Sequence, residues 1–280
     1  MPISEPGVRL GTKIGPFEGC LSPDLVRRYA AATNDPSALA QQGLVVPPVA
    51  IVTQIWQAQN EARSAIVSPT LQQSATGGVH GQHDIVLHRP IMPGERLRIW
   101  VEGHGARPVG RNALVTLRYT AVDSDDRVVS EQWWSTVYLG TTCDAVGQVP
   151  PDHAFPEAAR DQLVGISVTT VDDDMPRRYA EVSGDWSAHH FDVAAAQRSG
   201  FANPFLHGLC TMALCAQGVV DLVADGDPAR VRRVAVRFAT PTFLDEELHL
   251  RIYDAGDQNY AFEGDCAGAT VITHGRVELS

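Results

Sequence analysis

The chain has 280 residues, of which 44% are apolar and 20% charged, an ordinary globular composition that argues against disorder and allows a sizeable core. Its formal net charge of −11 argues against nucleic acid or an anionic membrane surface as a partner. Because the five cysteines are scattered without a CxxC pair, and neither a signal peptide nor a membrane span is visible, we expect a reduced, cytoplasmic protein.

Each half of the chain predicts the same order of elements: a short helix, a longer apolar helix and four strands. The first short helix starts at Ser22-Pro23 and the long helix spans residues 48–64, whereas their counterparts start near Asp172 and span residues 206–224. The strands are rich in β-branched residues or alternate in polarity, and they are His83–His88, Leu97–Gly103, Ala113–Val122, Val128–Leu139, Val231–Ala239, Leu248–Ala255, Tyr260–Ala267 and Thr270–Leu279.

This order reflects an internal repeat. Residues 27–38 and 177–188 share seven of twelve positions, including an Arg-Arg-Tyr-Ala run, and Asp35 aligns with Asp185. Two weaker blocks follow at offsets of 157 and 151 residues, as expected after duplication and loop insertion. Helices followed by antiparallel strands predict an α+β architecture with one long helix on one face of each sheet.

The repeat divides the chain into two predicted domains. The first covers residues 1–140 and the second residues 166–280. Between them, residues 141–165 are aperiodic and contain Pro and Gly, which predicts a linker.

The residues that carry chemistry lie in the second half. Asp185 and His190 are five residues apart just after the short helix, and His207-Gly208 then opens the long apolar helix. A close carboxylate and imidazole can hold one water and transfer its protons. The free N–H of Gly208, aided by the helix dipole, can bind an oxygen on which negative charge develops.

These motifs resemble the MaoC-like (R)-specific enoyl-CoA hydratase/3-hydroxyacyl-CoA dehydratase family. Its signature is Ser-Gly-Asp-x-Asn-Pro-Leu/Ile-His followed by Gly-Phe-x-x-Pro-Ile-x-His-Gly, which correspond here to residues 183–190 and 200–208. The chain departs from it at Ser187-Ala188, which replace Asn-Pro, and at His189, which replaces an aliphatic residue. The resemblance implies a double hot-dog fold, two tandem repeats in each of which a sheet wraps around a long central helix.

The same resemblance implies a function. Asp185 and His190 would activate the water that adds to a trans-2-enoyl-CoA thioester, giving an (R)-3-hydroxyacyl-CoA in fatty-acid or steroid side-chain β-oxidation. The catalytic set would be Asp185, His190 and Gly208, with the acyl-CoA as substrate, no metal or organic cofactor, and a homodimer as the assembly. The alternatives are a 3-hydroxyacyl-carrier-protein dehydratase, a hydratase of short branched dicarboxylic thioesters, a weakly or non-catalytic acyl-thioester-binding subunit, and a metal-dependent enzyme.

Five further residues are candidates for contacting the substrate. Arginine binds phosphate through its planar, bidentate guanidinium, which favours three of them as ligands of the phosphates of coenzyme A. Trp186 lies beside Asp185 and could line the pocket or pack in the core, and His207 precedes Gly208. The predicted substrate-binding residues are therefore Trp186, His207, Arg232, Arg233 and Arg237.

The first half lacks the imidazoles of the second. Asp35 persists, but Ala40 stands where the second half has His190, and Ala50 where it has His207. We therefore expect a degenerate first domain that shapes the acyl pocket, and one active site per chain. The His80-Gly-Gln-His83-Asp84 segment falls on a predicted strand without convincing further ligands, so we expect no metal there.

Overall fold

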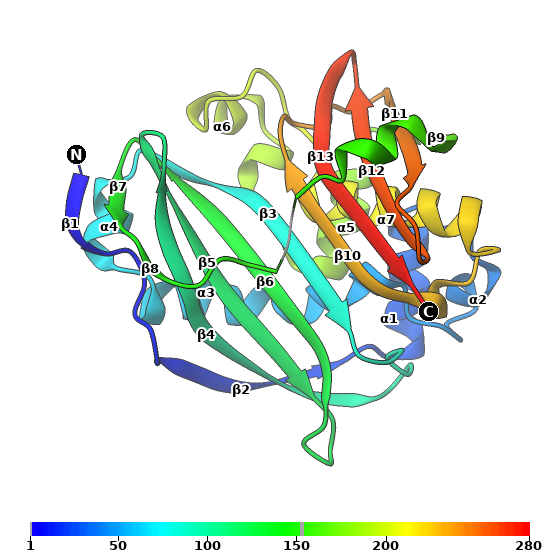
Figure 1. Cartoon of the computed structure of the whole chain (residues 1–280), viewed down its shortest axis with the longest axis horizontal. Coiled ribbons are helices and arrows are strands. Elements are labelled where there is room, and N and C mark those ends of the chain that lie inside the picture. Colours follow the sequence, from blue (N-terminus) through cyan, green and yellow to red (C-terminus); the bar gives the residue numbers. More distant parts are fainter. Residues whose placement is uncertain (1, 152–153) are drawn as a thin grey trace.

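The computed structural model describes residues 2–151 and 154–280. In this part of the chain one continuous sheet has the strand order β2-β4-β5-β6-β3-β10-β13-β12-β11-β9, and β1 and β7 form a separate two-stranded sheet. All neighbours in this order are antiparallel. Figure 1 shows strands β3 to β6 of the first half, cyan to green, beside strands β10 to β13 of the second half, orange to red. The predicted α+β class is confirmed.

The first half supplies one side of this sheet and the helices behind it. Its elements are β1 (Pro2–Pro6), β2 (Lys13–Cys20), α1 (Pro23–Ala32), α2 (Ala38–Gln41), the 3₁₀ helix η1 (Pro48–Gln54), α3 (Trp56–Ile66), α4 (Pro69–Ser74), β3 (Gly77–Leu87), β4 (Arg96–Val109), β5 (Asn112–Val122) and β6 (Val128–Leu139).

The second half follows the same order. Its elements are β9 (Leu163–Val171), α5 (Met175–Ser183), the 3₁₀ turn η3 (Ala188–His190), α6 (Val193–Arg198), α7 (Gly208–Val223), η4 (Pro228–Arg230), β10 (Val231–Phe238), β11 (Glu246–Asp254), β12 (Asn259–Cys266) and β13 (Ala269–Leu279). All eight predicted strands are present, but the two edge strands β2 and β9 were not predicted.

The connection between the halves is more structured than predicted. Residues 141–165 contain the short strands β7 (Thr142–Asp144) and β8 (Val146–Gly147), the 3₁₀ helix η2 (Glu157–Asp161) and the start of β9. β7 pairs with β1, and β8 pairs with β4. Residues 152–153 of the predicted linker lie outside the described residues.

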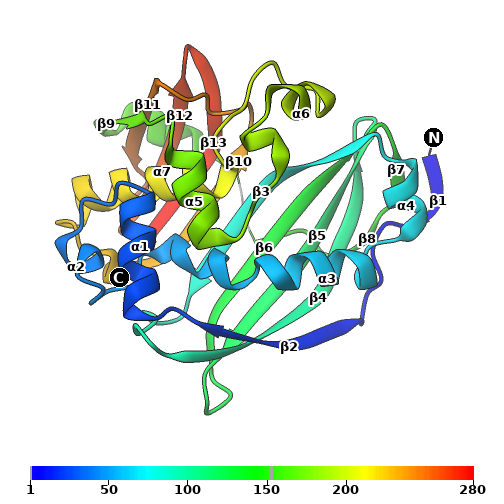
Figure 2. The same cartoon turned by 180° about the vertical axis from the view of Figure 1, so that it is seen from behind.

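The two long helices differ in form. α7 is continuous and almost entirely buried, as its apolar sequence predicts. The helix predicted over residues 48–64 is instead divided at Ile55 into η1 and α3. The segment Val49–Thr53 is dense in β-branched residues, which lose side-chain freedom in an α-helix. Figure 2 shows α3 lying across the strands of the first half. No helix among the described residues is long and apolar enough to span a membrane.

The short helices of the two repeats pack against each other. Ser22 caps α1 as predicted, since its hydroxyl accepts a hydrogen bond from Leu25 N at 3.1 Å. From α5, Arg178 Nη1 donates to the Ala31 carbonyl at 2.8 Å. The rings of Tyr29 and Tyr179, equivalent in the repeat, meet edge to face with centroids 6.1 Å apart. These contacts hold α1 and α5 side by side, together with the loops that follow them.

The strands of the first half and those of the second half meet within the sheet where β3 pairs with β10, and a buried ion pair lies at this junction. Arg233 donates to the Asp84 carboxylate through Nε at 3.0 Å and Nη2 at 2.6 Å, and its Nη1 also lies 3.1 Å from Glu278 Oε1. Asp84 is completely buried and Arg233 only 8% exposed. This arrangement argues against the predicted role of Arg233 in binding phosphate.

Removing the positive partner should therefore destabilise the whole molecule. In Arg233→Met, Asp84 becomes a buried carboxylate without its cation, which costs about 3–5 kcal/mol in comparable cases. We expect urea unfolding to show a loss of that size, and the Asp84→Leu/Arg233→Met double variant to recover most of it. A loss below about 1 kcal/mol in the single variant would contradict this role for the junction.

Candidate active site

The loop that carries Asp185 begins at a left-handed glycine. Gly184 closes α5 with φ = 79°, and its N–H donates to the Ala180 carbonyl at 2.8 Å. A side chain is strained in this conformation, so the sharp exit from the helix requires glycine. Asp185 follows directly and is partly exposed.

Ser187 orients the carboxylate of Asp185. Its backbone N–H and its hydroxyl both donate to Asp185 Oδ1, at 3.1 and 2.6 Å. An Asp side chain that binds the backbone N–H two residues on is a stable local turn. The 3₁₀ turn η3 then starts at Ala188 and ends at His190, whose side chain lies close to the Asp185 carboxylate. Ser187-Ala188, where the resemblance had Asn-Pro, is therefore compatible with an ordered carboxylate.

His190 is held as a neutral base. Its ring is only 6% exposed, and Nδ1 lies 2.8 Å from the carbonyl oxygen of Phe205. A carbonyl only accepts, so Nδ1 carries the proton and Nε2 keeps its lone pair. Burial, the largest cause, and the neighbouring imidazoles of His207 and His189 together lower the pKa of His190 to about 3.

His207 connects the loop to the start of α7. Its Nε2 donates to the backbone carbonyl of Asp185 at 2.9 Å, and its ring stacks on that of His190 with centroids 3.7 Å apart. Burial lowers the pKa of His207 to about 4. The ring is 2% exposed, and its Nδ1 is buried without a hydrogen-bond partner. His207 thus positions both Asp185 and His190.

Gly208 begins α7, directly after this stack. A Cβ at this position would lie 3.2–3.4 Å from the ring of Phe238, so the backbone approaches the aromatic ring closely. No side chain caps the helix at its N-terminus. The N–H groups of a first helical turn have no intrahelical acceptor and lie at the positive end of the dipole. They are therefore suited to bind an oxyanion.

Three of the predicted residues form a compact cluster. One ligand atom from each of Asp185, His190 and His207 lies within 4.8 Å of the others. A carboxylate and a neutral imidazole at this separation can hold one water between them. The same donor set, two imidazole nitrogens and one carboxylate, can also coordinate a metal ion.

The other predicted residues lie at different distances from this cluster. Trp186 is 51% exposed and its ring lies 5.5 Å from that of Phe191, so it is at the surface beside Asp185. Arg237 immediately precedes Phe238, and its Nε donates to Gln82 Oε1 at 3.3 Å. Arg232 is the second residue of β10 and lies about 20 Å along the strand from Phe238, at the rise of an extended chain. Of the three arginines, only Arg237 lies at the site's end of β10.

An aromatic row was not predicted from the sequence. Ring centroids are 6.1 Å apart for Trp56 and Trp134, 4.1 Å for Trp134 and His80, and 4.8 Å for His80 and Phe238. One end touches the active-site loop, because a Cβ at Gly184 would lie 3.5 Å from Trp56. The other end is Phe238, against Gly208. The row joins the two halves in space, and no pattern within one half signals it.

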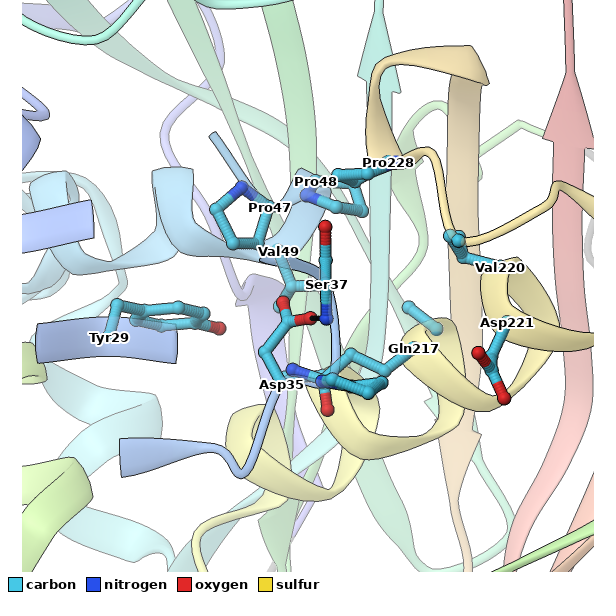
Figure 3. A pocket seen from close by; sticks show the side chains of 14 residues that line it. Tyr29, Asp35, Ser37, Pro47, Pro48, Val49, Gln217, Val220, Asp221 and Pro228 are labelled. Atoms are coloured by element: carbon cyan, nitrogen blue, oxygen red, sulfur yellow. Dashed lines mark hydrogen bonds between the residues drawn. The ribbon is translucent and has the colours of Figure 1, made fainter. Parts of the chain in front are cut away.

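The first half contains a degenerate counterpart of the site (Figure 3). Ser37 N donates to Asp35 Oδ1 at 2.9 Å, the same turn that Ser187 makes with Asp185. Asp35 is 4% exposed, burial raises its pKa, and it lines a cavity of about 20 Å³, enough for one water. Ala40 and Ala50 take the places of the two histidines.

Comparison with protein families decides which family the second half belongs to. A family model described as a MaoC like domain matches residues 154–275. The chain carries a MaoC-like domain. The family predicted from Asp185, His190 and the His207-Gly208 pair is thereby confirmed.

Curated relatives of the MaoC-like domain include hydratases and dehydratases. The chain is 29% identical over 202 residues to 3-hydroxyacyl-thioester dehydratase Y of Mycobacterium tuberculosis, covering 68% of this chain and 67% of that protein. It is 25% identical over 179 residues to the peroxisomal enoyl-CoA hydratase 2 of Arabidopsis thaliana, covering 61% of this chain and 58% of that protein. The chain thus spans less than two thirds of the second relative.

Solved structures show the same fold over nearly the whole chain. A MaoC-like dehydratase from Phytophthora capsici superimposes with a TM-score of 0.84 at 21% identity, covering 96% of this chain and 95% of that one. A Mycobacterium tuberculosis protein described as having a double hot-dog fold gives 0.61 at 15% identity, covering 96% and 95%. The predicted double hot-dog fold is confirmed.

The buried imidazoles should make stability depend on pH. Folding lowers the pKa of His190 from 6.5 to about 3. Between these two values the unfolded chain binds a proton at His190 and the folded chain does not. The free energy of unfolding therefore decreases as the pH falls from about 6.5 to about 3. From pH 7.5 to 5.0 we expect His190 to contribute a loss of about 1–2 kcal/mol. Urea unfolding of His190→Gln should show a shallower pH dependence by this amount, whereas the half-exposed His249→Gln control should match the wild type.

Proposed function

We propose that the MaoC-like domain catalyses the reversible addition of water to a trans-2-enoyl-CoA thioester, giving an (R)-3-hydroxyacyl-CoA. The observation that carries this proposal is the cluster itself. A carboxylate fixed by Ser187 and a neutral imidazole with its tautomer set by Phe205 lie beside the N-terminus of α7. The names of the relatives, a 3-hydroxyacyl-thioester dehydratase and an enoyl-CoA hydratase, support the same reaction in its two directions.

The water is the group that Asp185 and His190 share. His190 Nε2, which keeps its lone pair, takes a proton from the water as its oxygen bonds to the β-carbon of the enoyl group. The pair then delivers a proton to the α-carbon from the same side. The atoms of one water thus end in the product, as a hydroxyl on the β-carbon and a hydrogen on the α-carbon.

Negative charge develops on the thioester oxygen during this addition. The backbone N–H groups at Gly208 and the positive end of the α7 dipole are placed to stabilise it. A side chain at Gly208 would require the ring of Phe238 to shift. The hydrogen bond from His207 to the Asp185 carbonyl holds the loop of Asp185 next to the N-terminus of α7.

We further propose that this chemistry needs neither a metal nor an organic cofactor, since acid, base and oxyanion donor all come from the chain. Fatty-acid or steroid side-chain β-oxidation is the proposed setting, in the cytoplasm. A homodimer is the proposed assembly. Its support is the edge strand β9, which carries no charge and exposes the apolar side chains of Val164, Ile166 and Val168.

Turnover should depend on Asp185 and not on its counterpart Asp35. Loss of an enzymic acid or base costs about 10²–10⁴-fold in rate, so Asp185→Asn should lower the rate of hydration by that range. The measurement is loss of absorbance at the enoyl-thioester band with crotonyl-CoA, a medium-chain enoyl-CoA and a steroid side-chain enoyl-CoA. Asp35→Asn is the matched control and should retain the wild-type rate. Equal rates in wild type and Asp185→Asn would refute the assignment.

Chelation should leave turnover intact. If the water is activated by Asp185 and His190 alone, dialysis against EDTA followed by assay in metal-free buffer should give the untreated rate within about twofold. Loss of activity that returns when a divalent cation is added would instead establish a metal-dependent enzyme.

A further inference from the structure

The cavity beside Asp35 lies between polar side chains of the first half and α7 of the second half. One water needs about 10–15 Å³ of such space, and the cavity has about 20 Å³. Tyr29 of α1, Asp35 and Ser37 line it, together with Gln217 of α7. Figure 3 shows the hydroxyl end of Tyr29 directed toward the carboxylate of Asp35. The cavity is therefore polar and has the size of a single water.

Two hydroxyl groups at this cavity have no hydrogen-bond partner in the part of the chain that the structure describes. Tyr29 is completely buried and Ser37 is 9% exposed, and the hydroxyl of each is without a partner. Burial of a hydroxyl without a hydrogen bond is costly, so almost all such groups bind another protein atom or an ordered water. Both groups thus require a ligand of small size that can donate and accept.

The carboxylate of Asp35 provides an acceptor at the same place. Asp35 is 4% exposed, and its Oδ1 accepts a hydrogen bond from Ser37 N at 2.9 Å. An ionised carboxylate can accept about four hydrogen bonds, so it can receive another donor. On the opposite side of the cavity, Gln217 Nε2 donates to Thr33 Oγ1 at 2.8 Å and holds α7 against the end of α1.

We propose that this cavity binds one ordered water, held by Tyr29, Asp35 and Ser37. The water accepts a hydrogen bond from the hydroxyl of Tyr29 and donates to the carboxylate of Asp35 and to Ser37 Oγ. Three hydrogen bonds are typical of a buried water. The water links α1 to the loop of Asp35 at the surface of α7, so its role is structural.

The site is the counterpart, in the repeat, of the place where the proposed reaction holds its water, but it does not depend on that reaction. Asp35 and Asp185 each accept from the backbone N–H of the serine two residues on. In the first half a phenol, that of Tyr29, stands at the water in place of an imidazole. Burial raises the pKa of Tyr29 well above its ordinary value, so the phenol keeps its proton and cannot act as a base toward the water.

The first test is the sign of a change in stability. Tyr29→Phe keeps the ring and removes only the hydroxyl. If this hydroxyl binds a water, its loss should lower the midpoint of thermal unfolding of the full chain by about 2–4 °C, as for one hydrogen bond. A hydroxyl without a partner would give the opposite sign, because its removal relieves a cost of burial. An unchanged or raised midpoint would therefore overturn the proposal.

Tyr179→Phe is the matched control. Tyr179 is the equivalent of Tyr29 in the repeat, is 1% exposed and also has a hydroxyl without a partner, but it is not among the residues that line the cavity. We expect its midpoint to equal or exceed that of the wild type. Equal losses in the two variants would show that the loss does not come from the cavity, and would also overturn the proposal.

A crystal structure of the wild-type chain at high resolution provides the direct test, and it decides alone should Tyr29→Phe not fold. We expect a water within hydrogen-bond distance of both Tyr29 Oη and the carboxylate of Asp35. A cavity without electron density at this place would overturn the proposal.

Discussion

The hydrogen bond from His207 to the Asp185 carbonyl is the contact on which the site depends. It ties the loop after α5 to the residue that immediately precedes α7, so the carboxylate, the imidazole of His190 and the free N–H groups of the helix meet at one place. The stacked rings of His207 and His190 are both buried, and this burial lowers their pKa and keeps them neutral. One donor thereby sets the position of the acid–base pair relative to the oxyanion site, which matters because misplacement of about 1 Å can cost 10²-fold in rate.

The junction between the strands of the two halves gives this contact a rigid frame. β10 carries Arg233 in the buried pair with Asp84 of β3 and ends at Phe238, whose ring lies against Gly208. β10 therefore has two roles: it joins the strands of the two halves, and its last residue packs against the N-terminus of α7. Its pairing with β3 places His80 next to Phe238 and so brings the aromatic row of the first half to the site of the second.

The sequence predicts what is local and misses what depends on distant partners. The eight inner strands follow from their composition, and Asp185, His190 and Gly208 from short motifs within thirty residues. An arginine on a strand looks the same whether it faces phosphate or a buried carboxylate, and the partner of Arg233 lies 149 residues away. The contacts of Trp56 with Gly184 and of His80 with Phe238 likewise join residues of different halves. The division of the first long helix reflects β-branched residues whose effect on helix formation is small without tertiary packing.

After the duplication the two halves have diverged in what they contribute to the site. Asp35 and Asp185 make the same turn with the serine two residues on, so the backbone that orients a carboxylate persists in both. The first half has lost its histidines, yet it supplies Trp56, Trp134 and His80 to the row beside the working site. The cavity at Asp35 is lined by residues of both halves: α7 of the second half contributes Ala213, Ala216, Gln217, Val220 and Asp221, and the first half contributes the aromatic ring of Tyr29. A second active site would require histidines in place of Ala40 and Ala50 and also a larger cavity, because the present cavity has room for one water.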